Sequence, residues 1–575
     1  MVLSDQELGM LEQLTYLNHE VGDAAGLSGF DLSGDENCHH TVGELLERFD
    51  EKALQQLEQT ENVGFTRGKE WANIIRYLQN SKMKDLIMTD TMKKDDRLLG
   101  YCFVENEGDE SAIVTFKGTT GAEEWADNAL GLNQTDTQNQ LEAAEFIESL
   151  PYSDITVTGH SKGGNKAMYV ALVTDKVSRC VSFDGQGFSK EFMDKYWAEI
   201  QARGGNIKNF SLSADYVHLL MFPVPNAQQI YCQGYGVGNF LENHCPAAFF
   251  TVDENGNLLM EQNGQPHFTI VEEEAEAIRT AHELTTFLMN NASKEELAKT
   301  AHFMSVMLPC LMAENGGVDG LLELIRQDPE AAGIILAYLA KFAQVKDLSS
   351  KDLEKIFPVL GEMEKEMLAN LEKEMQNDGK LRALIAAGAI GADGLLGYII
   401  EQLQDGKSDE ITKWLLNKLC EAGNIDIDAG AIWDAADETF PNITTDGGMG
   451  NYRPRTGRIL DFSQNTYDAL RSTIDRINEM GSSPADAWKS YNTERWYMDL
   501  PIELAVKCID TFYDRVYDIN QECSRQMEEI FGNARQVDLA TSNQLKECRE
   551  ALQKSNARIE VMVSNIQLRR VVGPK

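Results

Sequence analysis

The chain has 575 residues, of which 42% are hydrophobic and 25% charged, and these are ordinary values for globular proteins. A single hydrophobic core stops growing near roughly 250 to 300 residues, so we expect at least two domains. With 92 acidic against 52 basic residues and a formal net charge of -40, the chain lacks the basic face that nucleic acid requires, and simple electrostatic docking on anionic lipid is disfavoured.

Cysteine usage and the N-terminus bear on where the protein works. The ten cysteines are scattered without a Cys-x-x-Cys pair, which favours reduced thiols over a disulfide framework. The N-terminus lacks the basic start and apolar run of a signal peptide, and no stretch reaches the roughly 18 uninterrupted apolar residues of a spanning helix. We therefore expect a cytoplasmic protein, or one exported without a cleaved signal peptide.

Short β-rich runs alternate with helical patterns from about residue 84 to 250, which is typical of a sheet covered by helices. A helix is expected at 165–175, and an Asn-Gly turn at Asn255-Gly256 predicts a hairpin. The runs expected to form strands, in a sheet with a parallel core, are 99–104, 112–116, 155–158, 180–183, 207–212 and 229–232.

Beyond the expected hairpin the pattern becomes helical. Residues from about 269 to 429 place apolar side chains at helical spacing with no convincing strand. A stretch at 440–458, rich in Gly, Asp, Thr and Pro, is typical of a linker, and long amphipathic helices are expected after it. We predict an α/β domain at 1–285, a helical domain at 286–450, and a long-helix region at 451–575 that serves dimerisation, regulation or targeting.

The segment Gly159-His-Ser-Lys-Gly163 carries the clearest chemical signal. It follows an expected strand and precedes an expected helix, which is the context of the nucleophile elbow in α/β-hydrolases. A serine hydroxyl is a poor nucleophile until a base removes its proton, and this tight turn presents the hydroxyl to such a base. Ser161 is therefore the predicted nucleophile.

The catalytic base is expected after Ser161, because the α/β-hydrolase order is nucleophile, acid, histidine. His218, His244 and His267 qualify by position. His244 follows the last expected core strand and is favoured, since bases are carried on such edge loops. His267 follows the hairpin, where a surface residue is the simpler interpretation.

Two aspartates compete for the role of the acid. Asp215 ends the expected strand at 207–212 and is favoured over Asp184, which ends the preceding one. His218 lies only three residues beyond Asp215, which leaves little room for both side chains to converge. The predicted triad is thus Ser161, Asp215 and His244, while His160 is interpreted as a packing residue of the elbow.

Acyl transfer also needs donors for the developing oxyanion. The backbone N–H of Lys162 follows the nucleophile, and Thr119 lies after an earlier strand, so these are the predicted donors. No cofactor or metal is predicted, because the polar patch Cys38-His-His40 is more typical of a loop than of a metal site.

At these residues the chain resembles the DUF2974 group of bacterial lipase-like α/β-hydrolases, which are similar to class 3 lipases. The resemblance covers about the first 270 residues. It implies the triad Ser161, Asp215 and His244 with Thr119 as an oxyanion donor, although Lys162 stands where leucine is usual and places a cation beside the acyl site. It depends on Leu14-Thr-Tyr-Leu17, Phe116-Lys-Gly-Thr119 with Trp125 and Asn128, Gly159-His-Ser-Lys-Gly-Gly164, Ser182-Phe-Asp-Gly-Gln-Gly-Phe188, Asp215-Tyr-Val217 and Asn243-His-Cys-Pro246.

The function predicted from the sequence is hydrolysis of carboxylic esters, lipase- or phospholipase-like, through an acyl-enzyme. The expected partners are an ester or lipid substrate, with peripheral lipid contact, and a second copy or a helical partner protein at 451–575. The alternatives are an inactive hydrolase that acts as an interaction protein and a secreted lipase toxin with a helical targeting module. Peptidase or thioesterase chemistry would use the same triad.

Overall fold

The computed structural model describes residues 2–94, 97–119, 131–235 without 216 and 219, 243–303 without 302, 317–357, 360–362, 365, 369, 394–405, 410–422, 427–445, 448–449 and 452. The chain divides into two compact units, Met1–Arg453 and Pro454–Lys575, and all described residues belong to the first. The boundary expected at 285 falls inside helix α12, Glu276–Asn291. The three-domain division stays a prediction, and the region 451–575 lies outside the described residues except for Tyr452.

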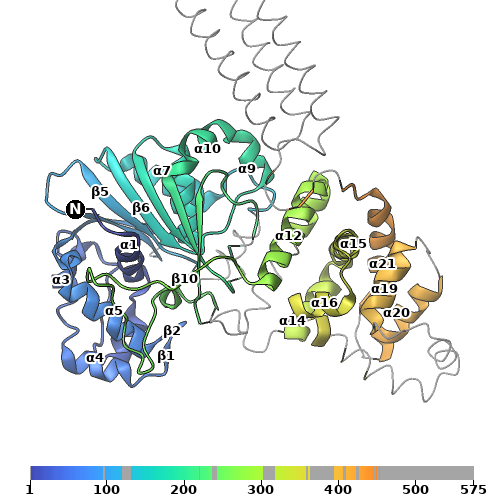
Figure 1. Ribbon diagram of the computed structural model, residues 1–575, viewed down its shortest axis with the longest axis horizontal. Coiled ribbons are helices and arrows are strands. Elements are labelled where there is room, and N and C mark those ends of the chain that lie inside the picture. The colour runs from blue at the N-terminus through green and yellow to red at the C-terminus, as the bar shows by residue number, and fades with distance from the viewer. Residues whose placement is uncertain are drawn as a thin grey trace, which may run out of the picture. The chain divides into compact units, whose positions relative to one another are not determined.

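An eight-stranded sheet is the centre of the α/β part (Figure 1). Strands β5 to β9 run parallel, whereas β3, β4 and β10 are antiparallel additions at the two edges. This arrangement confirms the predicted α/β fold with a parallel core. In spatial order the strands are β10 (Ile270–Val271), β9 (Gln228–Cys232), β8 (Ile207–Leu212), β7 (Val177–Phe183), β6 (Asp154–His160), β5 (Ser111–Phe116), β4 (Arg97–Val104) and β3 (Ile87–Lys94).

The six runs predicted as strands lie within β4 to β9. The sequence interpretation missed the edge strand β3, whose charged and half-buried residues hide its pattern, and β10, which is only two residues long. It also missed a small separate ladder, in which β1 (Asn62–Val63) pairs with β2 (Thr66–Arg67). The helix expected at 165–175 is present as α8, Lys162–Val173.

Two helical layers cover the sheet, and strand residues alternate between them. Phe183 of β7 packs with the N-terminal helices. Cys180, three positions earlier on the same strand, faces the other way and packs with the helices that connect the parallel strands. The N-terminal layer contains α1 (Asp5–Glu12), η1 (Gln13–Tyr16), α2 (His19–Ala24), α3 (Val42–Leu45), α4 (Glu51–Glu58) and α5 (Gly68–Asn80). The opposite layer contains α7 (Gln138–Ser149), α8, α9 (Lys190–Lys195) and α10 (Trp197–Arg203).

The turn predicted at Asn255-Gly256 forms, but the flanking residues make no continuous strands. Gly256 has a φ of 76°, and the amide of Asp253 donates to Asn257 O at 2.8 Å. The Asp253 carboxylate accepts from the amides of Asn255 and Asn257, which gives the turn its own closed hydrogen-bond set. Beyond it, pairing is limited to an isolated bridge between Val252 and Leu258.

The described residues after the sheet form a helical region, as the sequence predicted. Trp433 is fully buried in a core that is continuous with the α7–α10 face of the sheet. Among the described residues, no helix is both long and apolar enough to cross a membrane. The helices are α12, α14 (Gly317–Gln327), α15 (Pro329–Lys346), α16 (Ser350–Ile356), α19 (Gly394–Gln404), α20 (Glu410–Ala422) and α21 (Ala429–Thr439).

Candidate active site

Ser161 stands at a sharp turn between β6 and α8. Its backbone has a φ of 59° and a ψ of -125°, a combination that costs about 1–3 kcal/mol and persists only where the surroundings fix it. The Ser161 amide donates to Phe183 O at 2.8 Å, and the Ser161 carbonyl accepts from Asn165 N at 3.0 Å to begin the helix. The predicted nucleophile therefore has the geometry of a nucleophile elbow.

The glycines on both sides of Ser161 make this turn sterically possible. A Cβ on Gly159 would lie 2.6 Å from the carbonyl carbon of Gly163 and 2.6 Å from Phe116 O. A Cβ on Gly163 would lie only 2.1 Å from Phe116 O. Helix α8 thus begins in direct contact with the end of β5, and only glycine fits at either position.

The loop after β5 lies against the turn. A Cβ on Gly118 would be 3.3 Å from the Cβ of Ser161, so Gly118 and its neighbour Thr119 are placed beside the nucleophile. The Gly118 amide donates to the hydroxyl of Tyr16, at 3.2 Å, which ties this loop to the N-terminal layer. Thr119 is half-buried and is the last described residue before 131, so Trp125 and Asn128 lie outside the described residues.

Lys162 is the first residue of α8, so its amide belongs to the group that no carbonyl of the helix itself can satisfy. Such an amide is suited to a developing negative charge. The Lys162 side chain is fully buried within the protein. The two predicted oxyanion donors, the Lys162 amide and Thr119, thus lie on α8 and on the loop after β5, which are the segments that meet at Ser161.

His160 precedes Ser161 and is buried, in agreement with its interpretation as a packing residue. Its Nδ1 is hydrogen-bonded to the Tyr16 hydroxyl at 2.9 Å, and burial together with nearby His244 lowers its pKa well below the ordinary value. A neutral His160 therefore packs beneath the turn. The ring centroids of His160 and His244 are 4.6 Å apart, which brings His244 to the residue adjoining the nucleophile.

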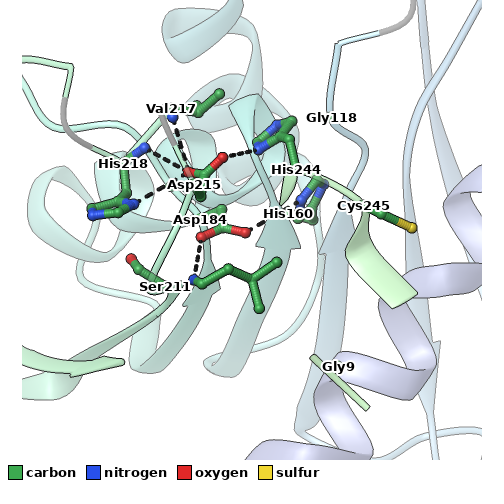
Figure 2. Close-up of polar contacts among 12 residues, drawn as sticks. Gly9, Gly118, His160, Asp184, Ser211, Asp215, Val217, His218, His244 and Cys245 are labelled. Atoms are coloured by element: carbon green, nitrogen blue, oxygen red, sulfur yellow. Dashed lines mark hydrogen bonds and ion pairs between the residues drawn. The ribbon is translucent and has the colours of Figure 1, made fainter. Parts of the chain in front are cut away.

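His244 and Asp215, the base and the acid expected from the sequence, are hydrogen-bonded to each other (Figure 2). His244 Nδ1 lies 2.8 Å from Asp215 Oδ1, and both side chains are buried. This contact fixes the Nδ1–H tautomer, in which Nδ1 donates and Nε2 is left as the basic nitrogen. Burial alone would raise the pKa of Asp215, but the charges and hydrogen bonds of His244 and His218 outweigh it and hold that pKa below its usual range.

Asp184, the alternative acid, has a different environment. Its Oδ1 accepts from the amide of Leu212 at 2.8 Å, and its Oδ2 is 3.9 Å from His160 Nε2 (Figure 2). Burial and the negative charge of Asp215 raise the pKa of Asp184 well above its ordinary value. The two environments therefore favour the neutral form of Asp184 and the ionised form of Asp215.

The expectation that there is little room for His218 and Asp215 to converge is wrong. Asp215 Oδ2 accepts from the backbone amides of Val217 and His218, both at 2.9 Å, and lies 3.2 Å from His218 Nδ1. A tight turn after the aspartate brings the ring back onto its carboxylate. His267, in contrast, is partly exposed and pairs with Glu261 at 2.5 Å, as a surface residue does.

Some side chains of this network also have the atoms and the spacing that a metal ion could bind. Among the described residues, two buried sets have ligand atoms within 4.8 Å of one another: His160, Asp184 and His244, and Asp184, Asp215 and His218. An ion there would compete with the hydrogen bonds that these side chains already make. At the 38–40 patch, the side chains of His39 and His40 are exposed and lie 3.7 Å from Glu107 and Glu44.

Thiol chemistry is not apparent at the described cysteines. The six that the structure describes carry free thiols, which agrees with reduced cysteines in this part of the chain. Cys245, beside His244, is buried between the Thr66 hydroxyl at 3.5 Å and the Tyr235 hydroxyl at 3.9 Å. Burial raises the pKa of Cys245 to about 11, so Cys245 packs as a neutral thiol in the loop that carries His244.

A comparison with known protein families matches the α/β part of the chain. The model of a family described as a Tle-like phospholipase domain matches residues 68–293, a stretch that contains Ser161, Asp215 and His244 but not Tyr16. This part of the chain is thereby supported as a lipase-like, phospholipase-type hydrolase domain. The resemblance to the DUF2974 group in particular stays a prediction. Neither the curated proteins nor the solved structures contained a match to the chain.

Proposed function

We propose that the protein is a serine hydrolase that cleaves carboxylic esters of lipids through an acyl-enzyme. Ser161 is the nucleophile, His244 the base and Asp215 the acid that orients it. The observation that carries the proposal is the backbone of Ser161, held at a φ of 59° between β6 and α8 beside the buried His244–Asp215 pair. The phospholipase-like family match supports a lipid ester as the substrate class.

In the proposed first step, His244 Nε2 removes the proton from Ser161 Oγ as Oγ forms a bond to the ester carbonyl carbon. The carbonyl π electrons move to oxygen. When the tetrahedral intermediate collapses, the C–O bond to the alcohol breaks and His244 gives its proton to the leaving alkoxide. Water then repeats the sequence on the acyl-enzyme, which releases the carboxylic acid and restores Ser161.

In the proposal, neighbouring groups stabilise each charge that develops during the cycle. Asp215, ionised at neutral pH, stabilises the imidazolium of His244 at 2.8 Å. The Lys162 amide and Thr119 are the proposed donors to the oxyanion. A single donor of this kind contributes roughly 3–4 kcal/mol to the barrier reduction.

The two buried aspartates allow a matched test of the proposal. The wild-type protein is expected to hydrolyse p-nitrophenyl esters from acetate to palmitate or phospholipids in vesicles, and Asp215→Asn to lower kcat by roughly 10³- to 10⁴-fold, because His244 loses its anionic partner. Asp184→Asn is expected to stay within about tenfold of wild type, since burial favours the neutral form of Asp184 and the asparagine oxygen still accepts from Leu212 N.

Steady-state kinetics on the three proteins decide between the acids. Equal losses in Asp215→Asn and Asp184→Asn, or a loss confined to Asp184→Asn, would contradict the assignment of Asp215. A folded wild-type protein that hydrolyses none of these esters would contradict the proposed function itself.

A further inference from the structure

Asp215 is shared by two histidines, and each has its own carboxylate oxygen. His244 Nδ1 lies 2.8 Å from Oδ1, and His218 Nδ1 lies 3.2 Å from Oδ2 (Figure 2). The same Oδ2 also accepts the Val217 and His218 amides. A carboxylate with one oxygen occupied in this way has lost the freedom to rotate about its χ2 angle. Only Oδ1 is left in the correct direction for His244.

His218 is itself held from its other side. Its Nε2 lies 2.9 Å from Glu274 Oε2, and both side chains are largely buried. The second Glu274 oxygen, Oε1, is 4.0 Å from His282 Nδ1 on α12. The contacts therefore run from α12 through Glu274 and His218 to Asp215 and His244.

The loop that carries His218 is also packed on the helical region. Leu220 of this loop contacts an apolar cluster formed by Ile278 and Ala281 of α12 and Ile356 of α16. Glu274 lies directly before α12, so one polar contact and one apolar contact join the acid loop to the same helix. The position of Asp215 thus depends on a helix that also packs against α15 and α16.

We propose that His218, held by Glu274, is a positioning residue of the triad: it fixes Asp215 through Oδ2 and places a positive charge behind it. This inference rests on the proposed function, because it assigns a role relative to the base His244. Neither His218 nor Glu274 takes up the Ser161 proton. Their effect reaches the reaction through the orientation and charge of Asp215.

The charged groups around His218 set the sign of this effect. Burial would lower the pKa of His218, but the hydrogen bonds and charges of Asp215 and Glu274 raise it to about 9, so the ring is cationic at neutral pH. Three other titratable groups lie nearby. Burial lowers the pKa of His282 on α12, and the ring of Tyr231 on β9 lies 6.0 Å from that of His218, centroid to centroid. The third group is Asp184, whose pKa is raised by burial. Arg279 on α12 acts on Glu274.

A cation behind Asp215 reduces the attraction of the carboxylate for a second proton on His244. Without it, His244 protonates more readily, and the acidic limb of the kcat/KM profile moves to higher pH. With an effective dielectric constant near 20, a unit charge at about 7 Å changes a pKa by roughly 1.7 units by Coulomb's law, so a shift of about one unit is a conservative expectation.

The test is the pH profile of kcat/KM for full-length wild type, His218→Gln and Glu274→Gln with one p-nitrophenyl ester. We expect the acidic limb of the His218→Gln profile to move to higher pH by about one unit, with a roughly tenfold loss of kcat at neutral pH. Glu274→Gln is expected to move the limb the opposite way, to lower pH, because it removes the anion that partly offsets the charge of His218 while His218 stays paired with Asp215. Glu273→Gln removes an exposed carboxylate that pairs with Arg279 at 2.7 Å, and its profile is expected to match wild type.

An acidic limb of His218→Gln that coincides with wild type would overturn the inference, even if kcat falls, because a merely structural role lowers activity without moving the limb. If His218→Gln does not fold, Glu274→Gln decides, and its unshifted limb would overturn the inference equally. A wild type that hydrolyses no ester defeats the proposed function, whereas an active wild type with unshifted variants defeats only the role of His218.

Discussion

Replacing Ser161 with alanine is expected to lower kcat for ester hydrolysis by about 10⁴-fold or more, because the residue that forms the acyl-enzyme is removed. The substitution keeps the Cβ, so the backbone strain at a φ of 59° is unchanged and the fold should be retained. Initial rates with p-nitrophenyl esters and phospholipid vesicles measure the loss, and the melting temperature reports on folding.

The matched control is Ser178→Ala, which removes a serine hydroxyl from an exposed position of β7. Its activity is expected to equal that of wild type. A Ser161→Ala protein that hydrolyses esters within tenfold of wild type would contradict the role of Ser161, since no other described serine shares its position on the turn.

The second large effect is expected on stability, from Gly163→Ala. The added Cβ would lie 2.1 Å from Phe116 O and 2.7 Å from the Phe116 carbonyl carbon, both of them backbone atoms of the central sheet. The α8 helix and β5 must separate to admit the methyl group. We expect a destabilisation of about 3 kcal/mol, or a melting temperature lowered by roughly 5 °C or more.

Gly205→Ala is the control for this prediction, because a Cβ at Gly205 would meet no atom within 4 Å. Its melting temperature is expected to stay close to wild type, as for most substitutions at open positions. Equal melting temperatures for Gly163→Ala and wild type, measured by differential scanning calorimetry, would show that α8 does not begin in contact with β5 as described.

The central sheet was predictable because its strands are buried and rich in β-branched residues. The runs 112–116 and 155–158 stand out in this way and lie in β5 and β6. At the edge, β3 mixes Asp90, Lys93 and Lys94 with apolar residues, since one side of an edge strand faces solvent. Such a strand has a weak sequence pattern.

The sharp turn at Ser161 was predictable from local sequence, but the network around Asp215 was not. Gly159 and Gly163 are required by the turn itself, so their spacing identifies Ser161 without any distant contact. The convergence of His218 on Asp215 depends on loop conformation, and the contact with Glu274 joins residues 56 positions apart. Spacing along the chain contains no direct signal for either contact.

The N-terminal segment supports the site although it precedes the matched family region. Tyr16, on η1, is bonded to His160 Nδ1 at 2.9 Å and accepts from the Gly118 amide at 3.2 Å. The sequence indicated this segment only through the resemblance of Leu14-Thr-Tyr-Leu17, without a role for the hydroxyl. Fragments that begin at residue 68 are therefore expected to lack one support of the turn.

The helical region affects how the enzyme must be tested. Truncation near residue 285 would cut through α12, which carries Ile278 and Ala281 of the cluster beneath the His218 loop. Full-length protein is therefore the appropriate material for kinetics. Export and partner binding through 451–575 concern residues outside the described ranges and stay predictions.

The central claim is that Ser161 is an activated nucleophile, and covalent labelling of the full-length protein tests it most directly. A fluorophosphonate is expected to modify the wild type once, with mass spectrometry of the digest locating the adduct at Ser161. Labelling should be absent in Ser161→Ala and much slower in His244→Ala, which lacks the base. A folded wild type that does not react, or an adduct at another serine, would contradict the account.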